Sequence, residues 1–170
     1  MRFAFALVAI LVAGGPAFAQ HRHPPASYAG LQQRAVKALS GEQIADLRAG
    51  RGMSLALAAE LNGYPGPLHV LELADQLHLS ADQRQKMREL TDAMKAEAIP
   101  AGEELIAHEG ALDEAFAGGK IDAALLGTLT TKIGEAQGKL RAVHLKYHLT
   151  TAELLSAHQR LRYAELRGYR

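Results

Sequence analysis

The sequence contains no cysteine and no tryptophan, and its aromatic residues are five tyrosines and four phenylalanines in a chain of 170 residues. Without cysteine, no disulfide holds the fold, no thiolate binds a metal, and no lipid is attached through an N-terminal cysteine. A chain of this size without disulfides must rely on a packed core or on oligomerisation.

An excess of charge of one sign is also lacking, because 19 lysines and arginines stand against 18 aspartates and glutamates. This balance argues against nucleic acid as a partner. The patterns GxSxG and HExxH and a glycine-rich phosphate loop do not occur, so neither catalysis nor ATP use is expected. Alternating β-branched runs are missing as well, whereas Ala, Leu, Glu, Lys, Arg and Gln are abundant, which predicts an all-α protein.

Long hydrophobic runs are confined to residues 3–13, which follow Met1-Arg2 and precede a Gly-Gly-Pro break and Ala17-Phe18-Ala19. This layout predicts a signal peptide over 1–19, cleaved before Gln20. The run is too short to span a bilayer, so no stable membrane insertion is expected, although retention as an anchor is the alternative. Residues 20–38 are expected to form a flexible N-terminus, and residues 39–170 a single helical domain.

Gly and Pro interruptions divide the domain into predicted helices at about 41–49, 53–61, 67–78, 81–117, 122–149 and 157–167. The two long helices carry apolar residues at alternating spacings of three and four, which is typical of helices packed at a shallow angle. The seam of the second is Leu126, Leu129, Ile133, Ala136, Leu140, Val143 and Tyr147, and the seam of the first includes Met87, Leu90, Met94, Ala98, Ala101, Leu105 and Leu112. Gly118-Gly119 is the expected turn of an antiparallel hairpin.

Glycines and a proline inside the long helices disfavour helix. Gly127, Gly134 and Gly138 are expected to allow a close backbone approach. Pro100 is expected to kink the first long helix. A thin hairpin cannot bury both of its faces, so a homodimer is expected.

The pentapeptide Leu-Ser-x-x-Gln occurs three times, as LSGEQ at 39–43, LSADQ at 79–83 and LSAHQ at 155–159. Ser followed three residues later by Gln is a capping box, and the preceding Leu can act as a hydrophobic staple. Each copy therefore predicts a helix start. Thr150-Thr151-Ala152-Glu153 is a looser fourth version of the same pattern.

Two of these boxes, LSADQ and LSAHQ, with the helical pattern between them, resemble the LTxxQ-motif superfamily of periplasmic proteins, which includes the Spy/CpxP-like chaperones. The resemblance covers roughly residues 68–167, with Ser in place of Thr, and the stretch over 50–77 is similar to a Spy/CpxP-like subgroup. It implies a dimeric helical cradle in the periplasm that takes part in the envelope stress response. Its members bind unfolded or misfolded client proteins without ATP. The neutral charge departs from the basic cradle of the chaperones.

The alternative function is periplasmic binding or sensing of a heavy metal, because relatives in the same superfamily sense metals with His and Met ligands. His144 and His148 are four residues apart and share a helix face, a common spacing for two ligands of Zn, Ni, Co or Cu. The antiparallel hairpin is expected to place them opposite the region 87–94, where a methionine thioether can join them. The other interpretation is a pair of half-exposed histidines beside the seam.

The remaining candidate residues carry weaker expectations. His108 is expected to be a core or boundary histidine, His21 and His23 to bind metal weakly, and His69 with Glu72 to make a surface contact. The three methionines Met53, Met87 and Met94 are expected to fill the core.

Overall fold

The computed structural model describes residues 28–169, and every regular element in that range is a helix, as predicted. In chain order they are η1 (Leu31–Gln33, a 3-10 helix), α1 (Gly41–Arg48), α2 (Leu57–Glu60), α3 (Pro67–Glu72), α4 (Ala81–Ala117), α5 (Ala123–Leu154) and α6 (Ala157–Leu166). The predicted signal peptide, His21 and His23 lie outside the described residues. Within them, no helix is long and apolar enough to cross a membrane.

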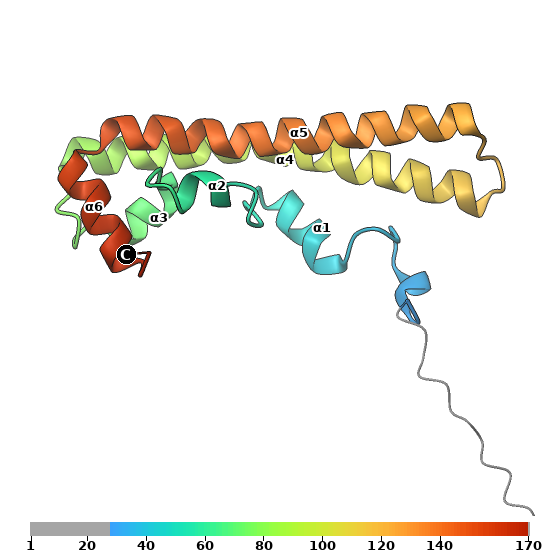
Figure 1. Ribbon diagram of the computed structural model, residues 1–170, viewed down its shortest axis with the longest axis horizontal. Coiled ribbons are helices and arrows are strands. Elements are labelled where there is room, and N and C mark those ends of the chain that lie inside the picture. The colour runs from blue at the N-terminus through green and yellow to red at the C-terminus, as the bar shows by residue number, and fades with distance from the viewer. Residues whose placement is uncertain (1–27, 170) are drawn as a thin grey trace, which may run out of the picture.

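Helices α4 and α5 form the predicted hairpin, and the short helices lie along one side of it (Figure 1). The predicted seams are largely buried: Met87, Met94, Ala98, Ala101 and Leu105 on α4, and Leu129, Ile133, Ala136, Leu140 and Tyr147 on α5. Helix α4 continues through Pro100. Helix α6 folds back at the end of the hairpin opposite its turn (Figure 1). Dimerisation stays a prediction, because the structure contains one chain.

Two hydrophobic clusters hold the short elements to the hairpin. The first joins α1 and the segment before it to the middle of the hairpin, and Leu47 is its central α1 residue. Val36 packs in the same cluster, so the packed fold begins before residue 39, the boundary expected from the sequence. The second cluster lies at the α6 end and contains Val70, Met87 and Tyr163, each at most 1% exposed.

All three Leu-Ser-x-x-Gln segments form capping boxes, with Ser40, Ser80 and Ser156 each accepting the backbone N–H of the Gln three residues later. The last two boxes also bind each other. The side-chain amide of Gln83 donates to Gln159 Oε1 at 3.0 Å, and the amide of Gln159 donates to Gln83 Oε1 at 3.1 Å. These reciprocal hydrogen bonds link the start of α4 to the start of α6 across the end of the hairpin. The capping pattern alone did not predict this contact.

The fourth, looser box does not cap a helix, and the predicted end of α5 at residue 149 is wrong. The helix runs on to Leu154, and Thr150 Oγ1 donates back to the carbonyl of Lys146 at 3.3 Å. Thr151 and Ala152 are buried at 0% and 2% exposure. Packing of this last turn therefore keeps it helical despite the capping pattern at 150–153. The helix ends before Leu155, whose backbone is extended.

Two short helices are shorter than the sequence predicts. Helix α2 begins at Leu57 rather than at 53, because Met53 and Ser54 both adopt positive φ angles of 40° and 66°. Helix α3 ends at Glu72 rather than at 78, and the chain continues in turns up to His78, which has φ 49°. A non-glycine residue in the left-handed region ends a helical segment without the glycine that would reveal it in the sequence.

The glycines of α5 do not have the predicted role within this chain. A Cβ placed on Gly127, Gly134 or Gly138 meets nothing within 4 Å, because all three lie on the exposed face of the helix. The close approach occurs instead at Gly102 on α4. A Cβ there would lie 2.9 Å from the carbonyl oxygen of Leu47, so α1 packs directly against the α4 backbone.

Candidate functional site

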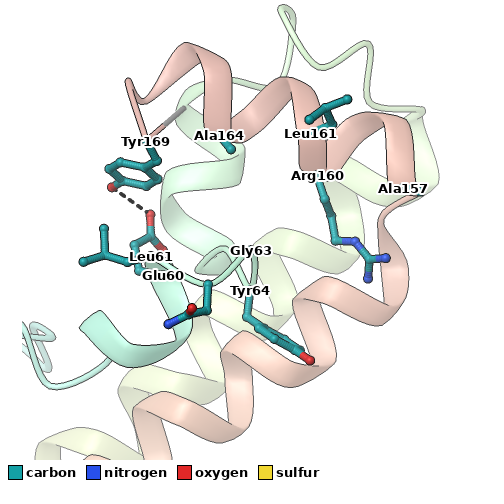
Figure 2. Close-up of a pocket in the computed structure, with 10 residues that line it drawn as sticks. Glu60, Leu61, Gly63, Tyr64, Ala157, Arg160, Leu161, Ala164 and Tyr169 are labelled. Carbon is teal, nitrogen blue, oxygen red and sulfur yellow. Dashed lines mark hydrogen bonds between the residues drawn. The ribbon is translucent and has the colours of Figure 1, made fainter.

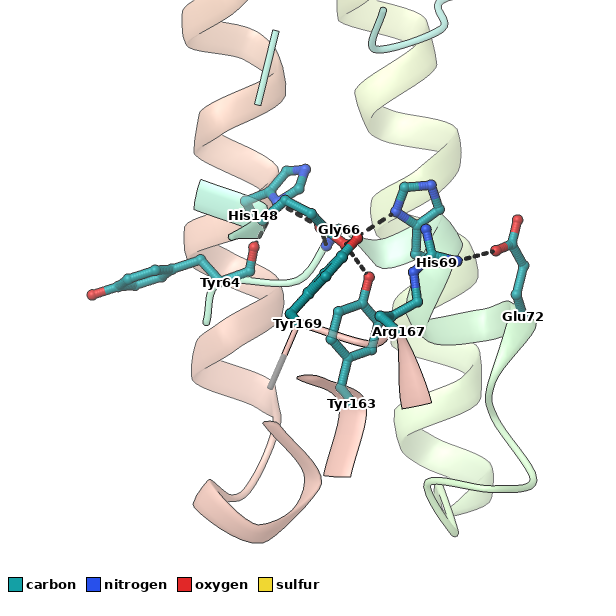
Figure 3. A network of polar contacts seen from close by, with 9 residues as sticks. Tyr64, Gly66, His69, Glu72, His148, Tyr163, Arg167 and Tyr169 are labelled. Carbon is teal, nitrogen blue, oxygen red and sulfur yellow. Dashed lines mark hydrogen bonds and ion pairs between the residues drawn. The ribbon is translucent and has the colours of Figure 1, made fainter. Parts of the chain in front are cut away.

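A buried carboxylate, Glu60 at the end of α2, is the centre of a polar network between the hairpin and α6. It is 6% exposed. Its Oε1 accepts hydrogen bonds from the hydroxyls of Tyr163 and Tyr169, the latter at 3.2 Å. Its Oε2 accepts the backbone N–H of Gly66 at 3.1 Å. Figure 3 shows Gly66, Tyr163 and Tyr169 close to one another, with His148 of α5 and His69 of α3 beside them.

Two histidines complete the surroundings of this carboxylate. Nδ1 of His69 lies 3.5 Å from Oε1, and Nδ1 of His148 lies 3.6 Å from Oε2. Burial alone would raise the pKa of Glu60, but the nearby imidazole of His69, the hydroxyl of Tyr163 and the N–H of Gly66 lower that pKa to about 2. Burial, together with the neighbouring carboxylate, raises the pKa of Tyr163. Glu60 is therefore ionised at neutral pH and accepts from protonated tyrosines.

The contacts of His148 fix its tautomer. Its Nδ1 lies 2.7 Å from the backbone carbonyl of Tyr64 and also faces the Glu60 carboxylate, so both neighbours are acceptors and Nδ1 carries the proton. In the neutral imidazole the lone pair is then on Nε2. A Cβ on Gly66 would lie 2.9 Å from this nitrogen, so only glycine lets the backbone approach the His148 ring this closely. A ring N–H held by a backbone carbonyl is the usual support of a metal-binding histidine.

His144, one turn earlier on α5, is 2% exposed. Its Nε2 is buried without a hydrogen-bond partner. Burial first, and the proximity of His148 second, lower the pKa of His144, so its imidazole is neutral at pH 7. An unpaired buried nitrogen of this kind costs free energy in the protein alone and is suited to receive a ligand.

Both histidines line a cavity of about 360 Å³, which we call the histidine cavity. Met94 of α4 lies on its wall, as the antiparallel hairpin predicted, while Met87 packs in the second hydrophobic cluster. The histidine cavity also contacts Gly52, Glu60, Gly66, His69, Arg167 and Tyr169. It thus presents two imidazoles, one thioether and the Glu60 carboxylate, which already accepts hydrogen bonds within the protein.

A second hollow, of about 580 Å³, lies on the other side of Glu60 between α6 and the loop over 61–64. Figure 2 shows Tyr64, Arg160 and Leu161 around it, with Tyr169 reaching Glu60 at one end. Glu60 and Tyr169 line both this outer groove and the histidine cavity. These two residues therefore form a shared wall between the two spaces.

Sequence reasoning placed the candidate histidines on the correct helix face but described their surroundings incompletely. His144 and His148 are buried rather than half-exposed, so the interpretation as surface residues is wrong. His69 lies beside Glu60, and Arg167 Nη1 lies 3.6 Å from Glu72 Oε2 (Figure 3). His108 lies at the boundary of the core, as predicted. The important residue missed was Glu60.

The described residues contain no group of three or more His, Cys, Asp and Glu side chains arranged to hold a metal ion. The candidate donors are the imidazole nitrogens of His144 and His148, whose side chains line the same cavity as Met94. The unpaired Nε2 of His144 is the structural feature that agrees with a ligand there.

An all-α hairpin with two buried histidines in a cavity thus defines the class of fold and site. Residues 55–162, more than half of the chain, match the model of a family described as heavy-metal resistance, and the chain belongs to that family. The family is related to the LTxxQ superfamily with its Spy/CpxP-like members, so the resemblance is supported at this level. No curated protein and no solved structure matches the chain.

Proposed function

We propose that this protein is a periplasmic metal-binding protein, exported by the segment 1–19, and that it holds its ion at His144 and His148. The observation that carries the proposal is the buried Nε2 of His144, which has no partner and belongs to a residue lining the same cavity as His148 and Met94. Membership of the heavy-metal resistance family supports the same class of ligand.

The donor set suits a soft or borderline ion. Imidazole binds Cu, Zn and Ni, while a thioether favours Cu(I) over harder ions. We therefore expect copper to bind most tightly among Cu, Zn, Ni and Co. An ion at this position would bridge α4 and α5 and supply a fixed link between them, with a fourth position open to water or a partner.

Calorimetric titration of each ion into the full exported chain tests the proposal. His21 and His23 are first replaced by alanine, because a flexible His-x-His pair can bind metal by itself. In that background, His144→Ala/His148→Ala should weaken binding by about 100-fold or more, since loss of a mere supporting residue already costs 10–100-fold. Met94→Leu should weaken copper more than zinc.

The matched control is His78→Ala/His158→Ala, which removes two exposed histidines and should leave the affinity unchanged. Affinity should also fall with pH as the imidazoles take up protons. Because burial lowers the pKa of His144, protons compete at that residue only below its ordinary value of 6.5. Equal affinities in the two double variants would show that the metal binds elsewhere or not at all.

A second candidate function, binding of unfolded client proteins, is favoured by exposed apolar side chains beside the two hollows. Leu57, Leu61 and Leu161 are 49%, 56% and 44% exposed. Large exposed apolar groups gathered near polar rims are typical of interaction sites. A several-fold excess of purified protein, without ATP, should reduce the aggregation of a denatured client measured by light scattering. The variant Leu57→Ser/Leu61→Ser/Leu161→Ser should lose most of this effect, and no protection by the wild type would remove the function.

A further inference from the structure

The end of α6 directs a short segment back onto Glu60. Gly168 has φ 71°, its N–H binds the carbonyl of Glu165 at 3.0 Å, and the N–H of Tyr169 binds the carbonyl of Ala164 at 2.9 Å. This pair of bonds around a left-handed glycine is a Schellman cap, which reverses the chain direction after a helix. We call residues 167–169 the strap.

The cap places the Tyr169 side chain over the polar network. Its ring lies edge to face on Tyr163, with 6.4 Å between ring centroids, and its hydroxyl donates to Glu60 at 3.2 Å. In Figure 3 the ring lies between His148 and His69. Arg167 and Tyr169 both line the histidine cavity, so the strap forms part of its wall.

The contacts that hold the strap are weak compared with those that hold α6. Its hydrogen bond to Glu60 measures 3.2 Å, and the ion pair between Arg167 and Glu72 measures 3.6 Å with Glu72 half exposed. Tyr163 itself is 1% exposed and anchors the helix independently. A segment with few and partly exposed contacts opens locally at low cost, while the rest of the fold stays closed.

We propose that the strap gates the histidine cavity. Tyr169 is the gating residue, and its hydrogen bond to Glu60 holds the gate closed. In the closed state Tyr169 completes the wall between the histidine cavity and the outer groove. When the hydroxyl leaves Glu60, the two spaces join, and a ligand entering along the groove reaches His148 and His144. The gate rests on the proposed function because it controls access to the same histidines, but it makes a separate claim about their exposure.

Reaction of the metal-free full chain with diethyl pyrocarbonate tests the gate, because this reagent modifies accessible neutral imidazoles and needs no metal. Peptide mass spectrometry gives the rate at each histidine at constant pH. Tyr169→Ala should speed modification of His144 and His148 by about tenfold, as expected when a hydrogen bond and a ring contact no longer hold the segment closed. Tyr169→Phe, which keeps the ring, should give a smaller rise.

The exposed His158 provides an internal reference whose rate should not change, and Tyr28→Ala, at a tyrosine that is 79% exposed, is the matched control variant. Unchanged rates at His144 and His148 in Tyr169→Ala would overturn the gate. So would an equal rise at His108, farther along α4 toward the turn, because that result reports general loosening.

The gate and the metal site can fail separately. Selective exposure of the two histidines in a protein that binds no ion would leave the gate standing and remove the metal function. Tight metal binding with unchanged reactivity of His144 and His148 in Tyr169→Ala would support the metal function and remove the gate.

Discussion

Replacing Glu60 with glutamine is expected to lower the free energy of unfolding at pH 7 by about 3 kcal/mol, the value that corresponds to a pKa lowered from 4.5 to about 2. Donors surround both carboxylate oxygens, from Tyr163 and Tyr169 on one and from Gly66 on the other. Glutamine turns one acceptor into a donor, so a buried N–H or O–H loses its partner. Urea denaturation followed by circular dichroism measures the change.

The dependence of this effect on pH has a defined sign. The carboxylate pKa is lower in the folded than in the unfolded protein, so its stabilisation is fully present above pH 4.5 and disappears as the pH falls toward 2. The difference between wild type and Glu60→Gln should shrink over that window. Glu72→Gln is the control, because Glu72 is half exposed and its ion pair should contribute less than about 1 kcal/mol. Equal losses of unfolding free energy in Glu60→Gln and Glu72→Gln would contradict a stabilising role of the buried network.

Replacing Gly102 with alanine should destabilise the protein by about 2 kcal/mol, although alanine is the better helix former. The added Cβ would lie 2.9 Å from the Leu47 carbonyl oxygen and 3.2 Å from its carbon. These are backbone atoms, so α1 must move as a unit. Leu47 is 2% exposed in the first hydrophobic cluster, and the movement would disturb that packing.

The same substitution at Gly134 of α5 is the matched control. Its Cβ meets nothing within 4 Å, so alanine should stabilise the protein by up to about 1 kcal/mol. In thermal or urea unfolding, the midpoint should therefore fall for Gly102→Ala and rise for Gly134→Ala. Stabilisation by both would show that α1 does not rest on the backbone of α4. Destabilisation by Gly134→Ala would point instead to a contact with another chain at that face.

The hairpin could be predicted from sequence because its signals are local and repeated. The heptad spacing gave both seams, and the capping boxes at Ser80 and Ser156 gave the starts of α4 and α6. Since the turn fixes which residues face each other, His144 and Met94 could be placed on opposite helices before their cavity was known. The heavy-metal alternative followed from the spacing of His144 and His148 and from the resemblance to relatives that sense metals.

Glu60 could not be recognised because nothing near it in sequence distinguishes it from an acid on a solvated helix face. Its decisive partner, Tyr163, lies 103 residues farther along the chain. The end of α3 was hidden for a different reason, since neither glycine nor proline stands at its C-cap, Leu73, whose φ is −106°. In both places tertiary packing decided the outcome, and a single sequence carries little trace of it.

The long separation between Glu60 and its tyrosines also orders the steps by which the chain can fold. Helix α2 is made early in synthesis, but its carboxylate finds Tyr163 and Tyr169 only after more than a hundred further residues have emerged. Until then the charge must stay in water, so the 57–72 region cannot settle on the hairpin. This end of the fold is therefore expected to close last, once α6 has been made.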